Sequence, residues 1–344
     1  AALFAFKSPF SKGAILADEV GLGKTIEAGL VLSENWAEHK RKILIIVPSS
    51  LRKQWSAELV DKFYLPSIIL ESKSFNENIK QSNFNPFLQS DIVICSYQFA
   101  KSKIDYVKAV EWDLIVIDEA HRLRNAYRVD NKTARCLKDN LAAFKKLLLT
   151  ATPLQNSLLE LYSLVSFIDG NVFGDLVSYK QNYMRGELTT SDFADLKKRI
   201  KPVVYRTLRR QVLEYVKYTN RIAITQEFEP NADEQLLYES ISNYLMQDKL
   251  MALPNSQRTL ITLIMRKLLA SSSFAITDTL KSLIARLQKY YAELTGSTIE
   301  ETECSSLADE DFAEIYIEEN DEDEIEAENE LFGDFGILND DEKE

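Results

Sequence analysis

The chain has 344 residues, of which 45% are hydrophobic and 27% are charged, an ordinary globular composition with length enough for two or three packed units. No apolar run approaches the roughly 20 residues of a membrane-spanning helix, and the N-terminus lacks the layout of a signal peptide. These features argue against a membrane or secreted protein, and we expect a cytoplasmic one without membrane partners. Because the sequence begins at Ala1 rather than Met, we also expect a piece of a longer protein.

The net charge of −12 is distributed unevenly. Residues 300–344 contain 21 of the 53 acidic residues and one of the 41 basic residues, so residues 1–299 contain 40 basic and 32 acidic residues. A mildly basic body is compatible with a surface that binds a polyanion. The acidic segment predicts a solvated linker or, alternatively, a polyanion mimic that occupies such a surface.

Ligands for metal and disulfide chemistry are few. The three cysteines lie far apart without a CxxC pair, and His39 and His121 are the only histidines. We therefore predict neither disulfides nor a zinc site.

Short apolar runs alternate with longer amphipathic stretches between residues 13 and 150. The runs are rich in β-branched residues and Leu and lack polar alternation, as in strands buried on both faces. Strand and helix in repetition predict a parallel, doubly wound α/β sheet. The expected strands are 13–17, 42–47, 67–70, 91–95, 113–117 and 146–149, and the expected helices are 25–38, 50–63 and 130–143.

After Pro153 the pattern becomes mainly helical. Apolar spacing predicts helices over 154–168 and 191–215, and alternation predicts one more strand over 220–228. Further helices are expected over 232–249 and 255–294, broken near Pro254, with the last at about 279–294. The predicted domains are a lobe over 1–229 with a helical insertion at about 154–219, a helical extension over 230–295, and an acidic, mainly disordered linker or tail over 296–344.

The segment 17–25 has the features of a phosphate-binding loop. It follows a buried strand and opens a helix, and its glycines allow backbone N–H groups to approach phosphates. Lys24 is expected to bind the β- and γ-phosphates of ATP, and Thr25 to bind Mg²⁺. Asp18 stands where the usual pattern has glycine. The predicted nucleotide-binding residues are Gly21, Leu22, Gly23, Lys24, Thr25 and Ile26.

Two carboxylates end the apolar strand 113–117, at the edge where α/β sheets bind ligands. Asp118 is expected to hold Mg²⁺ and Glu119 to polarise the attacking water. The alternative for such a pair is a cap for the following helix. With a phosphate loop upstream, Lys24, Asp118 and Glu119 are the predicted catalytic residues, and Thr25 and Asp118 are the predicted metal ligands.

Further segments of distinctive sequence lie between and after these two sites. They are VPSSLRKQW at 47–55, ICSY at 94–97, LTATPLQN at 149–156, LELYSL at 159–164 and TLRR at 207–210. Together with DEVGLGKTIEAG at 18–29 and DEAH at 118–121, they resemble motifs of the Swi/Snf-type ATPases of helicase superfamily II, most closely the bacterial RapA/HepA-like branch. That family carries Asp-Glu in place of the first loop glycine, so Asp18 becomes an identifying feature.

The resemblance implies the N-terminal RecA-like lobe of an ATP-driven translocase that tracks along double-stranded DNA, associates with the bacterial nucleoid and remodels protein complexes. It implies contacts to the DNA backbone by Ser49, Ser50, Arg52, Ser96 and Tyr97. Ser49 and Ser50 are also typical of a helix N-cap.

Other residues of these segments have alternative roles. The resemblance implies that Thr150 and Thr152 couple hydrolysis to DNA, the alternative being an ordinary turn. Arg209 and Arg210 are expected to bind phosphate, brace the helical insertion or form a solvated basic surface. Trp55 and other scattered aromatic residues are expected in the core.

Motors of this class need a second RecA-like lobe that supplies arginine fingers. No segment here resembles that lobe, so we expect this chain to be one half of the ATPase and to hydrolyse ATP slowly alone. Two alternatives are a nucleotide-gated binding module without productive hydrolysis, which the presence of Glu119 disfavours, and an RNA helicase, which the sequence of motif I disfavours.

Overall fold

The computed structural model describes residues 1–7, 12–81, 84–128, 131–154, 157–185, 189–212, 224 and 231–246, together with separate positions between 265 and 291. Residues 1–218 belong to one unit and residues 219–316 to a second. The sequence placed this boundary at 229/230 because it assigned a strand at 220–228 to the first unit. That segment lies outside the described residues except for Ile224, which belongs to no strand.

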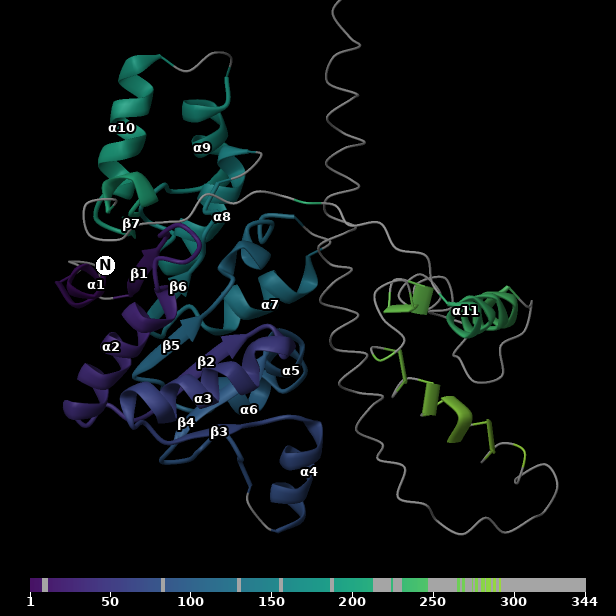
Figure 1. Ribbon diagram of the computed structural model, residues 1–344. Helices are drawn as coiled ribbons and strands as arrows, with labels where there is room; N and C mark the ends of the chain where they lie inside the picture. Colours follow the sequence, from purple (N-terminus) through teal and green to yellow (C-terminus); the bar gives the residue numbers. More distant parts are fainter. Residues whose placement is uncertain are drawn as a thin grey trace, which may run out of the picture. The chain divides into compact units, whose positions relative to one another are not determined.

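A seven-stranded parallel sheet forms the centre of the first unit, in the order β3-β4-β2-β5-β6-β1-β7 (Figure 1). The predicted parallel, doubly wound α/β fold is therefore confirmed. Because the strands are parallel, their carboxyl ends lie along one edge of the sheet. The strands are β1 Gly13–Leu16, β2 Ile43–Val47, β3 Ser67–Ile69, β4 Ile92–Ser96, β5 Leu114–Ile117, β6 Lys146–Leu149 and β7 Val204–Tyr205.

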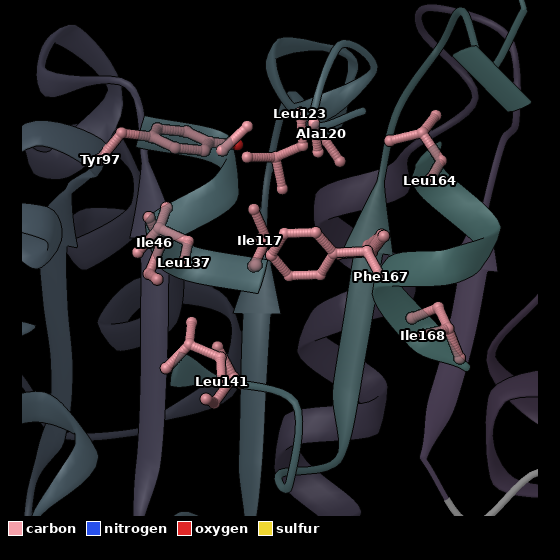
Figure 2. Close-up of a cluster of buried hydrophobic side chains, with 14 of the residues drawn as sticks. Ile46, Tyr97, Ile117, Ala120, Leu123, Leu137, Leu141, Leu164, Phe167 and Ile168 are labelled. Carbon is pink, nitrogen blue, oxygen red and sulfur yellow. The ribbon is translucent and has the colours of Figure 1, made fainter. Parts of the chain in front are cut away.

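Strand side chains alternate between two apolar layers, one on each face of the sheet. The first layer includes Ile46 and Ile117 and is shown in part in Figure 2, with Leu137 and Phe167 of the covering helices. Its helices are α4 Ser72–Lys80, α5 Tyr97–Ser102, α6 Ile104–Lys108, α7 Lys132–Asn140, α8 Leu158–Ile168, α9 Leu176–Tyr183 and α10 Thr190–Ile200. The second layer is covered by α1 Ala2–Lys7, α2 Lys24–Ala37 and α3 Arg52–Phe63.

Close approach of α2 to α3 in the second layer requires a glycine. A Cβ at Gly29 would lie 2.1 Å from Cζ of Phe63. The glycine after the phosphate loop therefore allows the loop helix to pack closely against α3.

One expected helix was wrong in its second half. The prediction ran over 191–215, but α10 ends at Ile200, just before Pro202. Val204 then pairs with Ile15 of β1, so the expected helical insertion contains the last strand of the sheet. A strand of two residues is too short to show a period. The helices α1, α4, α5, α6 and α9 were also missed.

The second unit contains α11 Ala232–Leu245, which begins where the sequence predicted. Asn231 caps it by accepting hydrogen bonds from the N–H groups of Asp233 and Glu234. Its apolar residues form a small core with helical positions farther along the chain, comprising Ile241, Leu245, Met265, Ile276 and Leu283. The expected acidic tail at 296–344 lies outside the described residues.

Cys95 is buried in β4, and Cys95 and Cys136 are free thiols; Cys304 lies outside the described residues. Among the helices that the structure describes, none combines the length and apolar character needed to cross a bilayer.

Candidate nucleotide-binding site

Segments far apart in the sequence meet at the carboxyl edge of the sheet (Figure 1). The phosphate loop follows β1, the carboxylate pair follows β5, and the segment beginning at Thr150 follows β6, which lies between the other two strands. Sheet pairing continues past the strand ends, since the N–H of Thr150 donates to Leu16 O (3.0 Å) and the N–H of Asp118 to Ile46 O (3.0 Å). Because β6 pairs with both β1 and β5, the three segments that follow these strands are held in fixed register.

The phosphate loop depends on two glycines. Gly21 and Gly23 have φ angles of 83° and 88°, which residues with a Cβ rarely adopt. Gly23 is the N-cap of α2, so the free N–H groups of the first turn start at Lys24. The Lys24 ammonium donates to the Asp18 carbonyl oxygen (3.2 Å). Backbone N–H groups, a helix N-terminus and a lysine are the groups that bind a polyphosphate.

Asp18, which replaces the usual loop glycine, joins the loop to the segment after β7. Its side chain is buried, and Oδ1 accepts a hydrogen bond from the Thr207 N–H (2.5 Å). The N–H of Glu19 donates to Thr207 O (3.2 Å). A glycine could not make the carboxylate bond, so this difference from the generic P-loop has a structural reason.

Arg209 extends the same connection. Its N–H donates to Glu19 Oε2 (2.6 Å), and its guanidinium donates to Val20 O from Nη2 (2.6 Å) and Nε (3.1 Å). The arginine pair was expected to bind phosphate, brace the helical insertion or form a solvated basic surface. These contacts favour a bracing role for Arg209, but it braces the phosphate loop and not the helical insertion. Arg210 is exposed.

Glu27 was not singled out by the sequence. Burial, followed by the neighbouring Asp18 carboxyl, holds its pKa well above the usual range for glutamate. Two neighbouring carboxyl groups that are shielded from water do not both ionise readily, so Glu27 and Asp18 together favour keeping one proton. The first turn of α2 therefore carries less negative charge toward the loop than its sequence suggests.

The carboxylate turn contains a deeply buried Asp118. Trp55 Nε1 donates to its Oδ2 (2.8 Å) and the Glu119 N–H to its Oδ1 (2.8 Å), while the Tyr97 hydroxyl donates to its carbonyl oxygen (2.5 Å). Burial raises the pKa of Asp118, and the Trp55 hydrogen bond opposes that rise.

Glu119 has a left-handed backbone, with φ 48°. A residue with a Cβ adopts this conformation at a cost of about 1–3 kcal/mol, which recurs at functional sites. His121 Nδ1 lies 3.1 Å from Glu119 Oε2, and this interaction lowers the pKa of Glu119. Glu119 is the N-cap residue of the following 3-10 helix, Ala120–Leu123, but its side chain makes no capping hydrogen bond, so the capping alternative gains no support from hydrogen bonding.

The loop and the turn lie within electrostatic reach of each other. The positive charge of Lys24 opposes the rise that burial causes in the Asp118 pKa, and it adds to the lowering that His121 causes in the Glu119 pKa. Thr25 on the first turn of α2 and the Asp118 carboxylate are oxygen donors of the kind that Mg²⁺ prefers. The residues present therefore fit a magnesium nucleotide.

The predicted DNA-contact residues are placed less favourably for that role. Ser50 is exposed, but Ser49, Arg52, Ser96 and Tyr97 are at most 8% exposed. Arg52 Nε donates to Ser49 O (3.1 Å), and Ser96 Oγ caps α5 by accepting from the Phe99 N–H (3.1 Å). Because these four side chains are buried, their position gives no support to a direct contact with a DNA backbone. The N-cap positions of the helices that start at Ser49 and Arg52 are occupied by Pro48 and Leu51, so neither serine stands at the position that the N-cap alternative gave it.

Thr150 is fully buried at the end of β6, and its Oγ1 accepts from the Thr152 N–H (3.2 Å). Thr150 thus lies between the loop and the turn, as a coupling residue would, but the bond is also that of an ordinary turn. Its coupling role stays a prediction.

The hydrogen bonds of Trp55 and Tyr97 to Asp118 were not anticipated. Trp55 was expected in the core, which is confirmed by an exposed fraction of 2%. The available signal for a contact between Trp55 and Asp118 was indirect. Trp55 belongs to the segment 47–55, which starts at the end of β2, and β2 pairs with β5, the strand that Asp118 follows.

Comparisons with known proteins indicate the family of this chain. The family model described as SNF2-related domain matches residues 5–288. The uncharacterized ATP-dependent helicase YqhH of Bacillus subtilis (strain 168) is 33% identical over 289 residues, which cover 83% of this chain and 48% of that protein. The chain thus spans about half the length of this bacterial relative.

One solved structure with a TM-score above 0.5 shows the same fold. The Sulfolobus solfataricus SWI2/SNF2 ATPase core in complex with dsDNA matches with a TM-score of 0.53 and 21% identity, over 86% of this chain and 63% of that one. The core domain from the same organism has a TM-score of 0.47 and 22% identity, over 74% and 52%. The narrower resemblance to the RapA/HepA-like branch stays a prediction. With a family model that spans most of its length, the chain belongs to the SNF2-related family of Swi/Snf-type superfamily II ATPases.

Proposed function

We propose that this chain is the ATP-binding lobe of a DNA-dependent ATPase that tracks along double-stranded DNA and remodels protein complexes on it. The observation that carries the proposal is the placement of the phosphate loop and the carboxylate turn at one sheet edge, with Lys24 acting electrostatically on both carboxylates. Family membership and a structural relative in complex with dsDNA support the nucleic-acid part.

Each site residue has a role that its surroundings favour. Lys24 and the N–H groups of the first turn of α2 bind the phosphates, and Thr25 and Asp118 hold Mg²⁺. When bound, Mg²⁺ neutralises phosphate charge and orients the phosphates. Glu119, kept ionised by His121, accepts hydrogen bonds from the attacking water and orients it.

The intact protein is proposed to place a second RecA-like lobe against this edge. The bacterial relative is about twice as long as the matched segment, which leaves room for such a lobe. Arginine fingers contribute on the order of 10³ or more in rate, so we expect this chain alone to bind nucleotide and hydrolyse it slowly. Fast, DNA-stimulated turnover by the chain alone would contradict the need for a second lobe.

The test compares the purified chain with its Glu119→Gln variant. ATP turnover is measured without nucleic acid and with duplex DNA, single-stranded DNA and duplex RNA, and ATP binding is measured by calorimetry. We expect slow turnover that duplex DNA increases most, and a loss of about 100-fold in turnover with unchanged ATP binding in Glu119→Gln.

Two outcomes would change the proposal. Stimulation by duplex RNA alone would favour an RNA helicase. Turnover that Glu119→Gln leaves unchanged, with ATP still bound, would favour a nucleotide-gated binding module without productive hydrolysis.

A further inference from the structure

Asp118 is held by partners on both faces of the sheet, one on its side chain and one on its backbone. Trp55 belongs to the apolar layer that α1 to α3 cover, whereas Tyr97 belongs to the opposite layer. Their polar groups nevertheless meet at the same residue, with Nε1 of Trp55 on the carboxylate and the hydroxyl of Tyr97 on the carbonyl oxygen. Trp55 and Tyr97 are each 2% exposed, so water does not compete for these bonds.

The pattern of bonds leaves room for a further ligand on the carboxylate. An ionised carboxylate has about four lone-pair sites. One N–H occupies a site on each oxygen, from Trp55 on Oδ2 and from Glu119 on Oδ1. Two donors on opposite oxygens fix the plane of the carboxylate, and the remaining lone pairs keep a defined direction.

We infer that Trp55 and Tyr97 are positioning residues, which hold the Asp118 carboxylate and its backbone in the orientation that binds the metal of the Mg·nucleotide complex. This inference rests on the proposed function. Partners of a metal-binding carboxylate orient it, and their loss lowers metal affinity about tenfold or more. A purely structural role would change stability without changing the contribution of the metal to nucleotide binding.

The chain offers a matched control for each residue. Trp112 is also buried and also donates from Nε1, but to Val107 O (2.8 Å). Tyr179 is fully buried, and its hydroxyl donates to Leu158 O (2.9 Å). Trp112→Phe and Tyr179→Phe therefore remove the same groups from the same kind of core, away from Asp118.

The experiment measures the dissociation constant of ADP by isothermal titration calorimetry, with excess Mg²⁺ and with EDTA, for the full chain and its variants. We expect Trp55→Phe and Tyr97→Phe each to weaken binding of Mg·ADP about tenfold and to leave binding of metal-free ADP unchanged. Asp118→Asn should show the same metal-specific loss, and Trp112→Phe and Tyr179→Phe should bind both forms as the wild type does.

The possible results separate this inference from the proposed function. Absence of ADP binding by the folded wild type would contradict both. Wild-type binding with a metal-specific loss only in Asp118→Asn, or equal losses with and without Mg²⁺ in Trp55→Phe and Tyr97→Phe, would contradict the inference alone. Thermal unfolding checks each variant, and the two positions are independent, so failure of one variant to fold leaves the other to decide.

Discussion

The phosphate loop after β1 and the carboxylate turn after β5 lie on the same sheet edge but are built in different ways. The loop owes its shape to two glycines with positive φ, and Val20 at its centre is 64% exposed. Asp118 in the turn is 7% exposed and is held by buried aromatic donors. The exposed part of the loop is braced by the exposed side chain of Arg209, whereas the turn is held by buried side chains.

This difference separates function from stability. A change to a loop side chain outside the core removes mainly contacts that a ligand would make, so it should alter binding with little effect on folding. A change in the turn alters groups that are also part of the core. Substitutions at the two places should therefore differ in how far nucleotide affinity and unfolding change together.

The largest effect is expected at Lys24. Lys24→Ala removes the ammonium that would contact the phosphates, and charge-assisted hydrogen bonds to phosphate are strong. We expect ADP affinity to fall about 100-fold by calorimetry, with an unchanged thermal unfolding temperature. Lys180→Ala, at an exposed position in α9, is the control and should leave both quantities unchanged. Unfolding of Lys24→Ala at a clearly lower temperature would show that the loop is part of the core, as the turn is.

A smaller effect is expected at Arg209, which braces the loop. Arg209→Ala removes the two guanidinium bonds to Val20 O. Because the loop then samples more conformations, we expect ADP affinity to fall several-fold while the unfolding temperature stays close to that of the wild type. A lysine ammonium cannot reproduce the two hydrogen bonds that the planar guanidinium makes, so Arg209→Lys should restore little of the lost ADP affinity. Exposed Arg210 provides the control, and an equal loss in Arg210→Ala would assign the effect to general basic charge.

The sequence predicted the parts of the fold that depend on local pattern. Six strands were visible as apolar runs because both faces of the sheet are covered, as Ile45 and Ile46 pointing into opposite layers illustrate. The seventh strand, Val204–Tyr205, was missed because it exists through pairing with β1 and has no pattern of its own.

The same limit applies to the site. Lys24, Asp118 and Glu119 could be named because their chemistry belongs to short contiguous motifs. The bond from Trp55 to Asp118 joins residues 63 positions apart, and that from Thr207 to Asp18 joins residues 189 apart. Neither bond has a local signal, because each depends on which strands become neighbours.

The smallest effect on binding is expected at Lys146, at the amino end of the strand between the loop and the turn. Its buried ammonium donates to Leu141 O (2.9 Å) and Phe144 O (2.7 Å), close to the end of α7. Lys146→Met leaves these carbonyls without that donor, so we expect the free energy of unfolding to fall by about 1–3 kcal/mol. ADP affinity should stay unchanged.

Burial lowers the pKa of Lys146 to about 8, below its ordinary value of 10.5. Between these values the unfolded chain binds more protons than the folded one, so the stability of the wild type rises with pH relative to Lys146→Met. Urea unfolding at pH 7, 8 and 9.5 measures how much the free energy of unfolding of the wild type exceeds that of Lys146→Met. This difference should be constant up to about pH 8 and then grow by on the order of 1 kcal/mol. A difference that shrinks above pH 8 would mean that the charged ammonium is favoured by its carbonyl partners, and that this end of β6 is stabilised by charge.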